Sequence, residues 1–245
     1  MYSSSPSEEG IWRAPDRDSG LEAVGSIPWG THFCQFYASK EELIATLVPY
    51  IKAGIEANEL CIWLTSAALS ACEAKAALSQ AVPMLDRYLA SKQIEIVDCS
   101  NWYDSGKGFK ADKVLAGWAA TLNTALERGF EGLRVTGDVS WLEGRGWKDF
   151  IDYEIDLDGG IGSKRMLTLC TYPLAKCGPS EILDVAAYHE FALVRRDGRW
   201  SVLENAAHRR VQREFKKFVS LADNSWEFIG MWDLDFVPST STKPA

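Results

Sequence analysis

Short apolar runs alternate with longer helical segments along most of this 245-residue chain. The runs read as strands buried on both faces, while Leu43, Leu47 and Ile51 repeat at the spacing of one helix face. Strands that alternate with helices form a mainly parallel sheet, because each helix returns the chain to the same edge. The sequence therefore predicts an α/β fold of three layers, with helices on both faces of the sheet.

The individual elements follow from the same patterns. Ser39 and Glu42 have the spacing of a capping box and start the first helix, while Pro83 breaks a long helical stretch over 67–91. Asp197-Gly198 predicts an antiparallel edge hairpin near the C-terminus. The other expected helices are 110–128, 147–157 and 180–188. The expected strands are 31–37, 60–64, 94–99, 133–139, 166–172, 191–194 and 200–203.

The chain divides into four parts by composition. Residues 1–25 are rich in Ser, Pro, Gly and charges and predict a flexible N-terminal segment. Residues 26–203 carry the α/β pattern, and 204–222 form an amphipathic, basic connector helix. That helix either packs on its own domain or pairs with its copy in a homodimer and transmits a signal. Residues 223–245 form a short tail.

Charge and cysteine content narrow the class of protein. The net charge of −8 argues against nucleic acid as a direct partner. No apolar stretch reaches the roughly 18 residues of a membrane span, and the polar N-terminus lacks the layout of a secretory signal. The six scattered cysteines suit reduced thiols rather than a disulfide framework. We therefore expect a cytoplasmic protein without a membrane partner.

Ligands of parallel α/β sheets bind at the carboxyl ends of the strands. Polar and aromatic residues follow five of the expected strands in this position, and we expect them to line a small-molecule site. We expect His32, Tyr37 and Asp138 to anchor the ligand. Its apolar walls would be Trp102, Trp141 and Tyr172. The carboxyl-end residues are Tyr37, Thr65, Ser66, Ser100, Trp102, Asp138, Trp141 and Tyr172.

The motifs of common enzymes are missing from the sequence. Ala38-Ser39-Lys40 follows the first strand where a phosphate-binding loop requires glycine, and Gly106-Lys107-Gly108 and Gly162-Ser163-Lys164 lack its spacing. No G-x-S-x-G nucleophile elbow occurs. We expect no catalytic activity in this chain, although Asp138 at a strand end keeps a degenerate nucleotide-binding module as an alternative.

A second alternative centres on His32 and Cys34, which alternation places on one face of the first strand. An imidazole and a thiolate on one side can bind a metal or haem iron, or form a thiol-redox sensor. Further donors would come from other elements, with His189 as a metal candidate. The simpler interpretation is a buried cysteine beside a hydrogen-bonded histidine. The remaining available donors are Cys61, Cys99 and Cys170, and Glu154 can turn inward from an otherwise solvated acidic helix.

Four sequence blocks occur in a familiar order: THFCQFYASKEELIATLVPYIKAGIEANELCIWLTS, GDVSW, LCTYPL and YHEFAL. Together they resemble the MEDS sensory domain of methanogens and methylotrophs over about residues 27–203. The resemblance implies a RecA/KaiC-like fold without a working phosphate loop. It also implies a sensory input domain for small organic compounds, of the kind joined to PAS domains in histidine kinases or transcription regulators. The tail from Phe218 resembles the start of a PAS domain.

The resemblance also marks positions. By its motif the candidate ligand-binding residues are His32, Cys34, Tyr37, Asp138, Trp141, Tyr172 and His189, in addition to Thr65 and Trp102 from the strand-end argument. It assigns no cofactor and no ligand. We therefore expect a cytoplasmic input domain of a two-component or related signalling system, with any kinase activity outside this chain.

Overall fold

A seven-stranded sheet forms the centre of the computed structural model, which describes residues 15–103, 109–142 and 146–205. The strand order is β5-β4-β6-β7-β3-β8-β9, and neighbouring strands are parallel except for β9 against β8. The expected α/β fold is therefore confirmed. The strands are β3 (His32–Tyr37), β4 (Leu60–Thr65), β5 (Ile94–Asp98), β6 (Leu133–Asp138), β7 (Met166–Pro173), β8 (Phe191–Arg196) and β9 (Arg199–Glu204).

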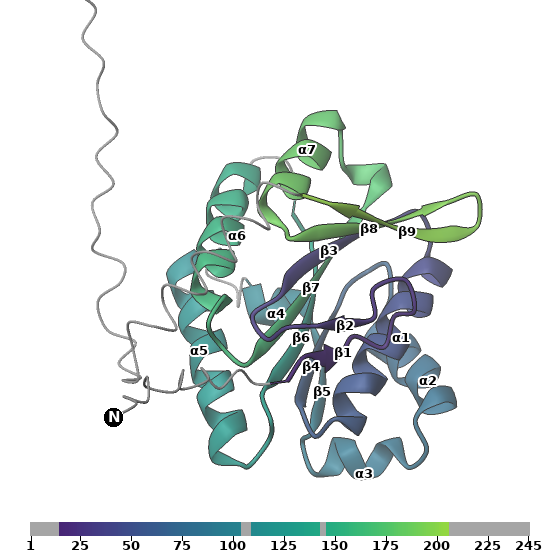
Figure 1. Cartoon of the computed structure of the whole chain (residues 1–245), viewed down its shortest axis with the longest axis vertical. Helices are drawn as coiled ribbons and strands as arrows, with labels where there is room; N and C mark the ends of the chain where they lie inside the picture. The colour runs from purple at the N-terminus through teal and green to yellow at the C-terminus, as the bar shows by residue number, and fades with distance from the viewer. Residues whose placement is uncertain (1–14, 104–108, 143–145, 206–245) are drawn as a thin grey trace, which may run out of the picture.

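Helices cover both faces of the sheet, as Figure 1 shows. One face carries α1 (Lys40–Glu56), α2 (Ala71–Ala81) and α3 (Leu85–Ala90). The other carries α4 (Cys99–Tyr103), α5 (Ala111–Glu127), α6 (Trp147–Ile161) and α7 (Pro179–Tyr188). β3 and β7 are neighbours in the sheet, but the chain leaves β3 toward one face and β7 toward the other. The carboxyl ends of these two strands therefore form a topological switch point.

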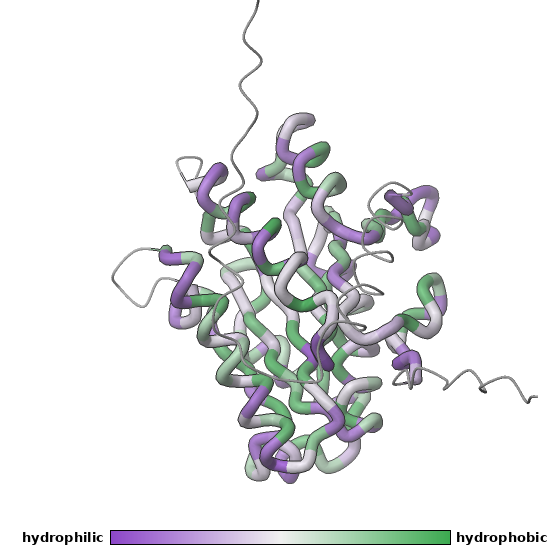
Figure 2. The backbone as a smooth tube through the Cα atoms, turned by 60° about the vertical axis from the view of Figure 1, so that its left-hand side comes forward, coloured by the Kyte–Doolittle hydropathy of each residue, from purple (hydrophilic) through white to green (hydrophobic). Residues whose placement is uncertain are grey.

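Strand alternation divides the core into two clusters. Cys34 and Phe36 of β3 lie on the α6 face, while Phe33 and Tyr37 lie on the α1 face. Figure 2 shows the hydrophobic strands at the centre and hydrophilic residues on the outer helices. Because both faces are covered, the central strands bury nearly all their side chains.

Several element ends differ from expectation for local reasons. The third expected strand ends at Asp98, because its carboxylate accepts hydrogen bonds from Ser100 and starts the short α4. The break at Pro83 is confirmed between α2 and α3. The Asp197-Gly198 turn has positive φ at both residues, 50° and 75°, as a tight hairpin requires. Within that hairpin β8 is parallel to β3, so only β9 is antiparallel.

The N-terminal segment departs from expectation where the structure describes it. Residues 15–25 were expected to be flexible, but β1 (Arg17–Asp18) pairs with β2 (Ser26–Ile27). The buried Arg134 guanidinium donates to the Asp18 carbonyl at 2.9 Å and to the Ser19 carbonyl at 3.4 Å. These bonds satisfy the guanidinium in the interior and hold the segment against the domain.

Two expected parts lie largely outside the described residues. The connector helix over 204–222 is described only at Glu204, the last residue of β9, and at Asn205. The tail over 223–245 is not described. Among the helices that are described, none combines the length and apolarity needed to cross a bilayer.

Candidate functional site

Four buried polar side chains meet between α6 and the sheet. His32 comes from β3, Glu154 from α6, Cys170 from β7 and His189 from the junction before β8. One donor atom of each lies within 4.8 Å of every other, and all four residues are buried. We call these residues the four-donor cluster.

Sheet register and helix phase bring the cluster together. Cys34 of β3 pairs with Cys170 of β7, so their side chains lie on the same face of the sheet. His32 lies two residues before Cys34 and therefore shares this α6 face with Cys170. On α6 the buried positions include Phe150, Glu154 and Asp158, each one turn from the next. The carboxylates of Glu154 and Asp158 therefore lie on the buried, sheet-facing side of α6 together with its apolar residues.

Backbone pairing positions the fourth member. The Glu190 N–H donates to the His32 carbonyl at 2.9 Å, which holds the α7–β8 junction beside the start of β3. The His189 ring consequently lies against the His32 ring, with centroids 4.1 Å apart.

The distances within the cluster are short. His32 Nε2 lies 3.1 Å from Glu154 Oε2 and 3.4 Å from Cys170 Sγ. His189 Nε2 lies 3.5 Å from the same Glu154 oxygen, and Cys170 Sγ lies 3.7 Å from it. Three nitrogen or sulfur atoms thus surround one carboxylate oxygen.

The outer nitrogens of both histidines also face oxygen atoms. His189 Nδ1 lies 2.7 Å from the Val185 carbonyl oxygen, and because a carbonyl only accepts, Nδ1 carries the proton. His32 Nδ1 lies 3.4 Å from Asp158 Oδ1. Both imidazoles are therefore oriented with Nε2 toward the cluster.

Burial and charge act together on the titratable groups. Burial, followed by the nearby Glu154 carboxylate, raises the pKa of the Cys170 thiol to about 12. Burial alone would lower the pKa of His32, but the Cys170 sulfur and the adjacent carboxylates outweigh it and raise that pKa well above its ordinary value.

An aromatic group borders the cluster on the same face. Tyr103 stacks on Trp141 at 5.1 Å between centroids, and Phe109 meets Tyr153 edge-on at 5.5 Å. Phe150 of α6 contacts all four of these rings. We call Tyr103, Phe109, Trp141, Phe150 and Tyr153 the aromatic group.

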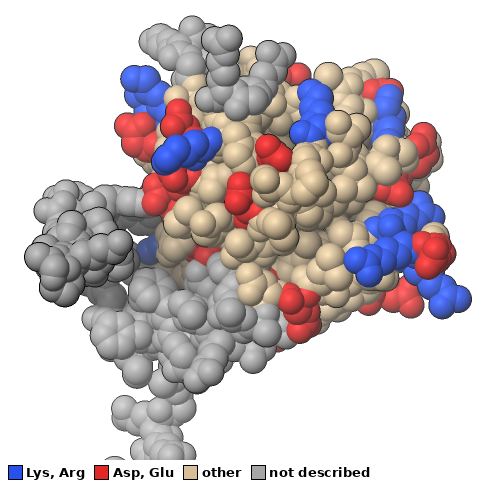
Figure 3. Space-filling view, turned by 90° about the horizontal axis from the view of Figure 1, so that it is seen from above, with Lys and Arg blue, Asp and Glu red and all other residues tan. Residues whose placement is uncertain are grey.

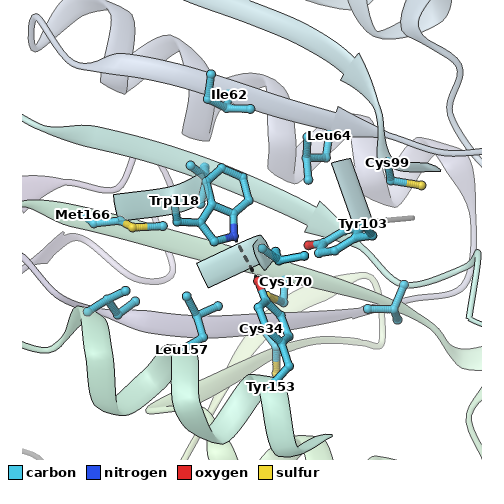
Figure 4. Close-up of a cluster of buried hydrophobic side chains, with 14 of the residues drawn as sticks. Cys34, Ile62, Leu64, Cys99, Tyr103, Trp118, Tyr153, Leu157, Met166 and Cys170 are labelled. Carbon is cyan, nitrogen blue, oxygen red and sulfur yellow. Dashed lines mark hydrogen bonds between the residues drawn. The ribbon is translucent and has the colours of Figure 1, made fainter. Parts of the chain in front are cut away.

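The aromatic group is fixed to its surroundings. Trp118 Nε1 donates to Tyr153 Oη at 3.0 Å, drawn as a dashed line in Figure 4. A Cβ atom on Gly137 of β6 would lie only 2.6 Å from Tyr103 Oη and 4.0 Å from Cys170 Sγ. Glycine at this position lets the Tyr103 hydroxyl reach the sheet close to the four-donor cluster.

Several buried polar atoms on this face have no hydrogen-bond partner among the described residues. They include Trp102 Nε1, Trp141 Nε1 and Tyr172 Oη. Trp102 stacks on Trp118 with centroids 4.1 Å apart, and Tyr172 meets the His189 ring edge-on at 5.7 Å. These residues follow or end β5, β6 and β7, as expected for strand-end positions.

A separate polar group lies on the opposite face of the sheet. Asp138 accepts hydrogen bonds from Tyr37 Oη at 2.9 Å and from Thr171 Oγ1 at 3.0 Å. Its other oxygen accepts from the Ser140 N–H at 2.9 Å. Thr65, also on this face, donates to the Val97 carbonyl. The Asp138 carboxylate is thus engaged by the protein's own groups.

The predicted ligand-binding residues therefore divide between two faces. His32, Cys34, Trp102, Trp141 and Tyr172 lie on the α5–α6 face, while Tyr37, Thr65 and Asp138 lie on the α1 face. Among the metal candidates, His32 and His189 meet in the cluster, but Cys34 is not one of its four members. Ser66 and Ser100 instead make local turn contacts.

Sequence reasoning missed several residues of this region. Asp158 belongs to the acidic helix that was expected to be largely solvated, but it is buried. The aromatic residues Tyr103, Phe109, Phe150 and Tyr153 were not singled out, although helical spacing from Glu154 points to Phe150. Tyr103 offered no such signal, because α4 was not expected. Cys170 was named only as a possible donor, since the sheet register decides which cysteine faces His32.

The start of α1 also bears on nucleotide binding. Glu42 Oε2 accepts the Ala38 N–H at 2.8 Å, and Ser39 caps the helix. The Glu42 carboxylate therefore takes one backbone N–H directly after β3, and its negative charge opposes a phosphate there.

Fold and site define an α/β domain of the RecA/KaiC-like class that has no glycine loop after β3. Among solved structures it is similar to a KaiC-like protein from Pyrococcus horikoshii OT3, with a TM-score of 0.52 and 14% identity over 77% of this chain and 86% of that one. The flagellar accessory protein FlaH from Methanocaldococcus jannaschii gives a TM-score of 0.49 and 12% identity over 79% of this chain and 90% of the other.

The sequence model of the methanogen/methylotroph, DcmR sensory domain (MEDS) matches residues 31–190. The chain therefore belongs to the MEDS family, as the resemblance of its sequence blocks indicated. A comparison with curated protein sequences finds no match. Membership makes the chain a sensory domain that serves as a signalling input.

Proposed function

We propose that this domain detects a small organic molecule on the α5–α6 face, at the carboxyl ends of β5, β6 and β7. The observation that carries the proposal is the set of buried polar atoms on Trp102, Trp141 and Tyr172 without hydrogen-bond partners among the described residues. A buried polar group left unpaired costs about 1–3 kcal/mol. A ligand that accepts a hydrogen bond from them would remove that cost.

The surroundings suggest the chemistry of the ligand. The aromatic group provides apolar walls next to those few polar atoms, which suits a small organic compound with one or two oxygen, nitrogen or halogen atoms. The family name refers to methanogens and methylotrophs, and one-carbon compounds are of this kind. Figure 3 shows acidic and basic side chains interspersed around a largely uncharged surface on the side viewed from above.

The proposal includes an output elsewhere in the signalling pathway. The domain has no catalytic activity of its own in this account, works in the cytoplasm, and controls a histidine kinase or transcription regulator. The basic amphipathic pattern over 204–222 supports a connector that pairs in a homodimer. Neither nucleic acid nor a membrane is a direct partner in this proposal. The net charge of −8 supports this, because it repels phosphate-rich partners.

Conservative substitutions test the site. Trp141→Phe and Tyr172→Phe remove one polar atom each but keep a ring, so the domain should fold. The probes are methanol and dichloromethane, and the readout is the thermal shift of the full chain at millimolar probe. We expect at least one probe to stabilise the wild type and each substitution to weaken the affinity for that probe about tenfold, equivalent to about 1.4 kcal/mol.

Trp200→Phe serves as the matched control, because Trp200 lies on β9, on the other face of the sheet. It should respond to the probes as the wild type does. A probe that stabilises wild type, Trp141→Phe and Tyr172→Phe equally would place the ligand elsewhere and contradict the proposal.

A further inference from the structure

We propose that His32, Glu154, Cys170 and His189 bind one Zn²⁺ ion in a closed, four-coordinate site. This inference goes beyond the proposed function and holds whether or not an organic ligand binds. Its basis is the convergence of four potential metal donors, from four different elements, in a fully buried position.

The distances fit tetrahedral zinc. Zinc–nitrogen and zinc–oxygen bonds of about 2.0–2.2 Å and a zinc–sulfur bond of about 2.3 Å place tetrahedral donors roughly 3.3–3.6 Å apart. The cluster has His32 to Glu154 at 3.1 Å, His32 to Cys170 at 3.4 Å and His189 to Glu154 at 3.5 Å. Cys170 to Glu154 is 3.7 Å. Small side-chain adjustments would place all four around one ion.

The outer contacts are those that metal-binding histidines need. A ligating imidazole usually donates its other N–H to a carbonyl or carboxylate, which fixes the tautomer and the ring orientation. His189 has the Val185 carbonyl 2.7 Å from Nδ1, and His32 has Asp158 Oδ1 3.4 Å from Nδ1. Both Nε2 lone pairs therefore face the position of the ion.

Charge balance also favours a divalent ion. A buried net charge is costly, because the interior solvates ions poorly. One Glu154 carboxylate and one Cys170 thiolate neutralise Zn²⁺, while both imidazoles stay neutral. In the metal-free arrangement the polar atoms near Cys170 Sγ are His32 Nε2 at 3.4 Å and the Glu154 oxygens at 3.7 and 3.9 Å, so a metal–thiolate bond would give Cys170 a stronger partner.

The donor types select the metal. Two imidazoles, one thiolate and one carboxylate suit zinc, whereas Mg²⁺ and Ca²⁺ prefer oxygen donors alone. Four protein donors leave no open position for substrate, which marks a structural or sensory ion. The ion would join β3, α6, β7 and the α7–β8 junction, and the Tyr172 ring beside His189 would adjoin the proposed ligand site.

Metal content and cobalt spectroscopy test the inference on the full chain. Protein purified under reducing conditions from zinc-supplemented cells should contain about one zinc per chain by elemental mass spectrometry. After zinc removal, titration with Co²⁺ should give visible d–d bands and a thiolate-to-cobalt charge-transfer band that saturate at one equivalent. A wild type without bound zinc and without these bands would overturn the proposal.

Substitutions identify the donors. Cys170→Ser should abolish the charge-transfer band, and His189→Gln and Glu154→Gln should weaken Co²⁺ binding at least tenfold. Cys34→Ser, at the register partner of Cys170, and Cys72→Ser, at an exposed thiol, should both keep the band. Circular dichroism checks that each variant folds. A charge-transfer band retained in a folded Cys170→Ser, or lost in Cys34→Ser, would refute this donor set.

Discussion

Glu154 extends from α6 to within 3.1 Å of His32 Nε2 on β3, across the interface between a helix and the sheet. This contact joins an acidic helix to the first strand of the main sheet, and both side chains are fully buried. The same carboxylate also faces Cys170 and His189, so it is the centre of the four-donor cluster.

Removal of the proposed zinc should lower the thermal stability of the domain. A ligand that binds only the native state at about 100 times its Kd adds about 2.7 kcal/mol, which is about 5–10 °C in Tm for a domain of this size. Differential scanning calorimetry with and without a zinc chelator measures the effect. A folded Glu154→Gln variant should lose less stability to the chelator, and equal losses in variant and wild type would contradict a site at Glu154.

The buried Arg134–Glu59 pair should contribute strongly to stability. Arg134 Nε lies 2.5 Å from Glu59 Oε2, and both side chains are fully buried. Glu59→Gln leaves the guanidinium without its counter-charge and should reduce the free energy of unfolding by about 3–5 kcal/mol, measured by urea denaturation. Asp152→Asn, in the exposed pair with Lys148, should change it far less. Similar losses in both variants would argue against this role of burial.

A methyl group at residue 137 should disturb the aromatic group. Gly137→Ala places Cβ about 2.6 Å from Tyr103 Oη, so the tyrosine must shift from Trp141. We expect a loss of about 1–3 kcal/mol and a change in tryptophan fluorescence. Gly159→Ala on α6 has open space around the new methyl group and should be neutral or stabilising by up to about 1 kcal/mol. An unchanged fluorescence spectrum in Gly137→Ala would contradict the close packing.

Thiol labelling should separate the cysteines by pH. Burial, with help from Glu181, raises the pKa of Cys177 to about 11, so only about one thiol in a thousand is ionised at pH 8. Labelling at pH 8 should modify the exposed Cys72 first, and the rate at Cys177 should rise about tenfold per pH unit up to its pKa. Because ionisation is harder in the folded state, stability should fall as pH rises toward 11. Rapid labelling of Cys177 at pH 8 in native protein, followed by peptide mass spectrometry, would contradict this order.

The alternation of elements made the fold predictable from sequence. Buried strands such as β4 and β6 are continuous apolar runs, and the amphipathic stripe of α1 is clear. What sequence alone did not reveal were short-range events, such as the Asp98 cap that starts α4. The contact of residues 15–25 with Arg134 is also invisible locally, because it joins segments more than 100 positions apart.

The candidate site was predictable in part for the same reason. Alternation correctly placed His32 and Cys34 on one face of β3. The register between β3 and β7, which brings Cys170 to His32, depends on tertiary pairing and has no local signal. Position at a strand end does not distinguish the two faces of the sheet, whereas the odd spacing of His32 and Tyr37 assigns them to opposite faces.

Native mass spectrometry of the full chain tests the central claim most directly, that this MEDS domain senses through the buried α5–α6 face. The account predicts a chain mass increased by one zinc ion, and a further adduct when methanol or dichloromethane is added, which Trp141→Phe weakens while the zinc remains. A chain of bare mass under all of these conditions, from folded protein, would contradict it.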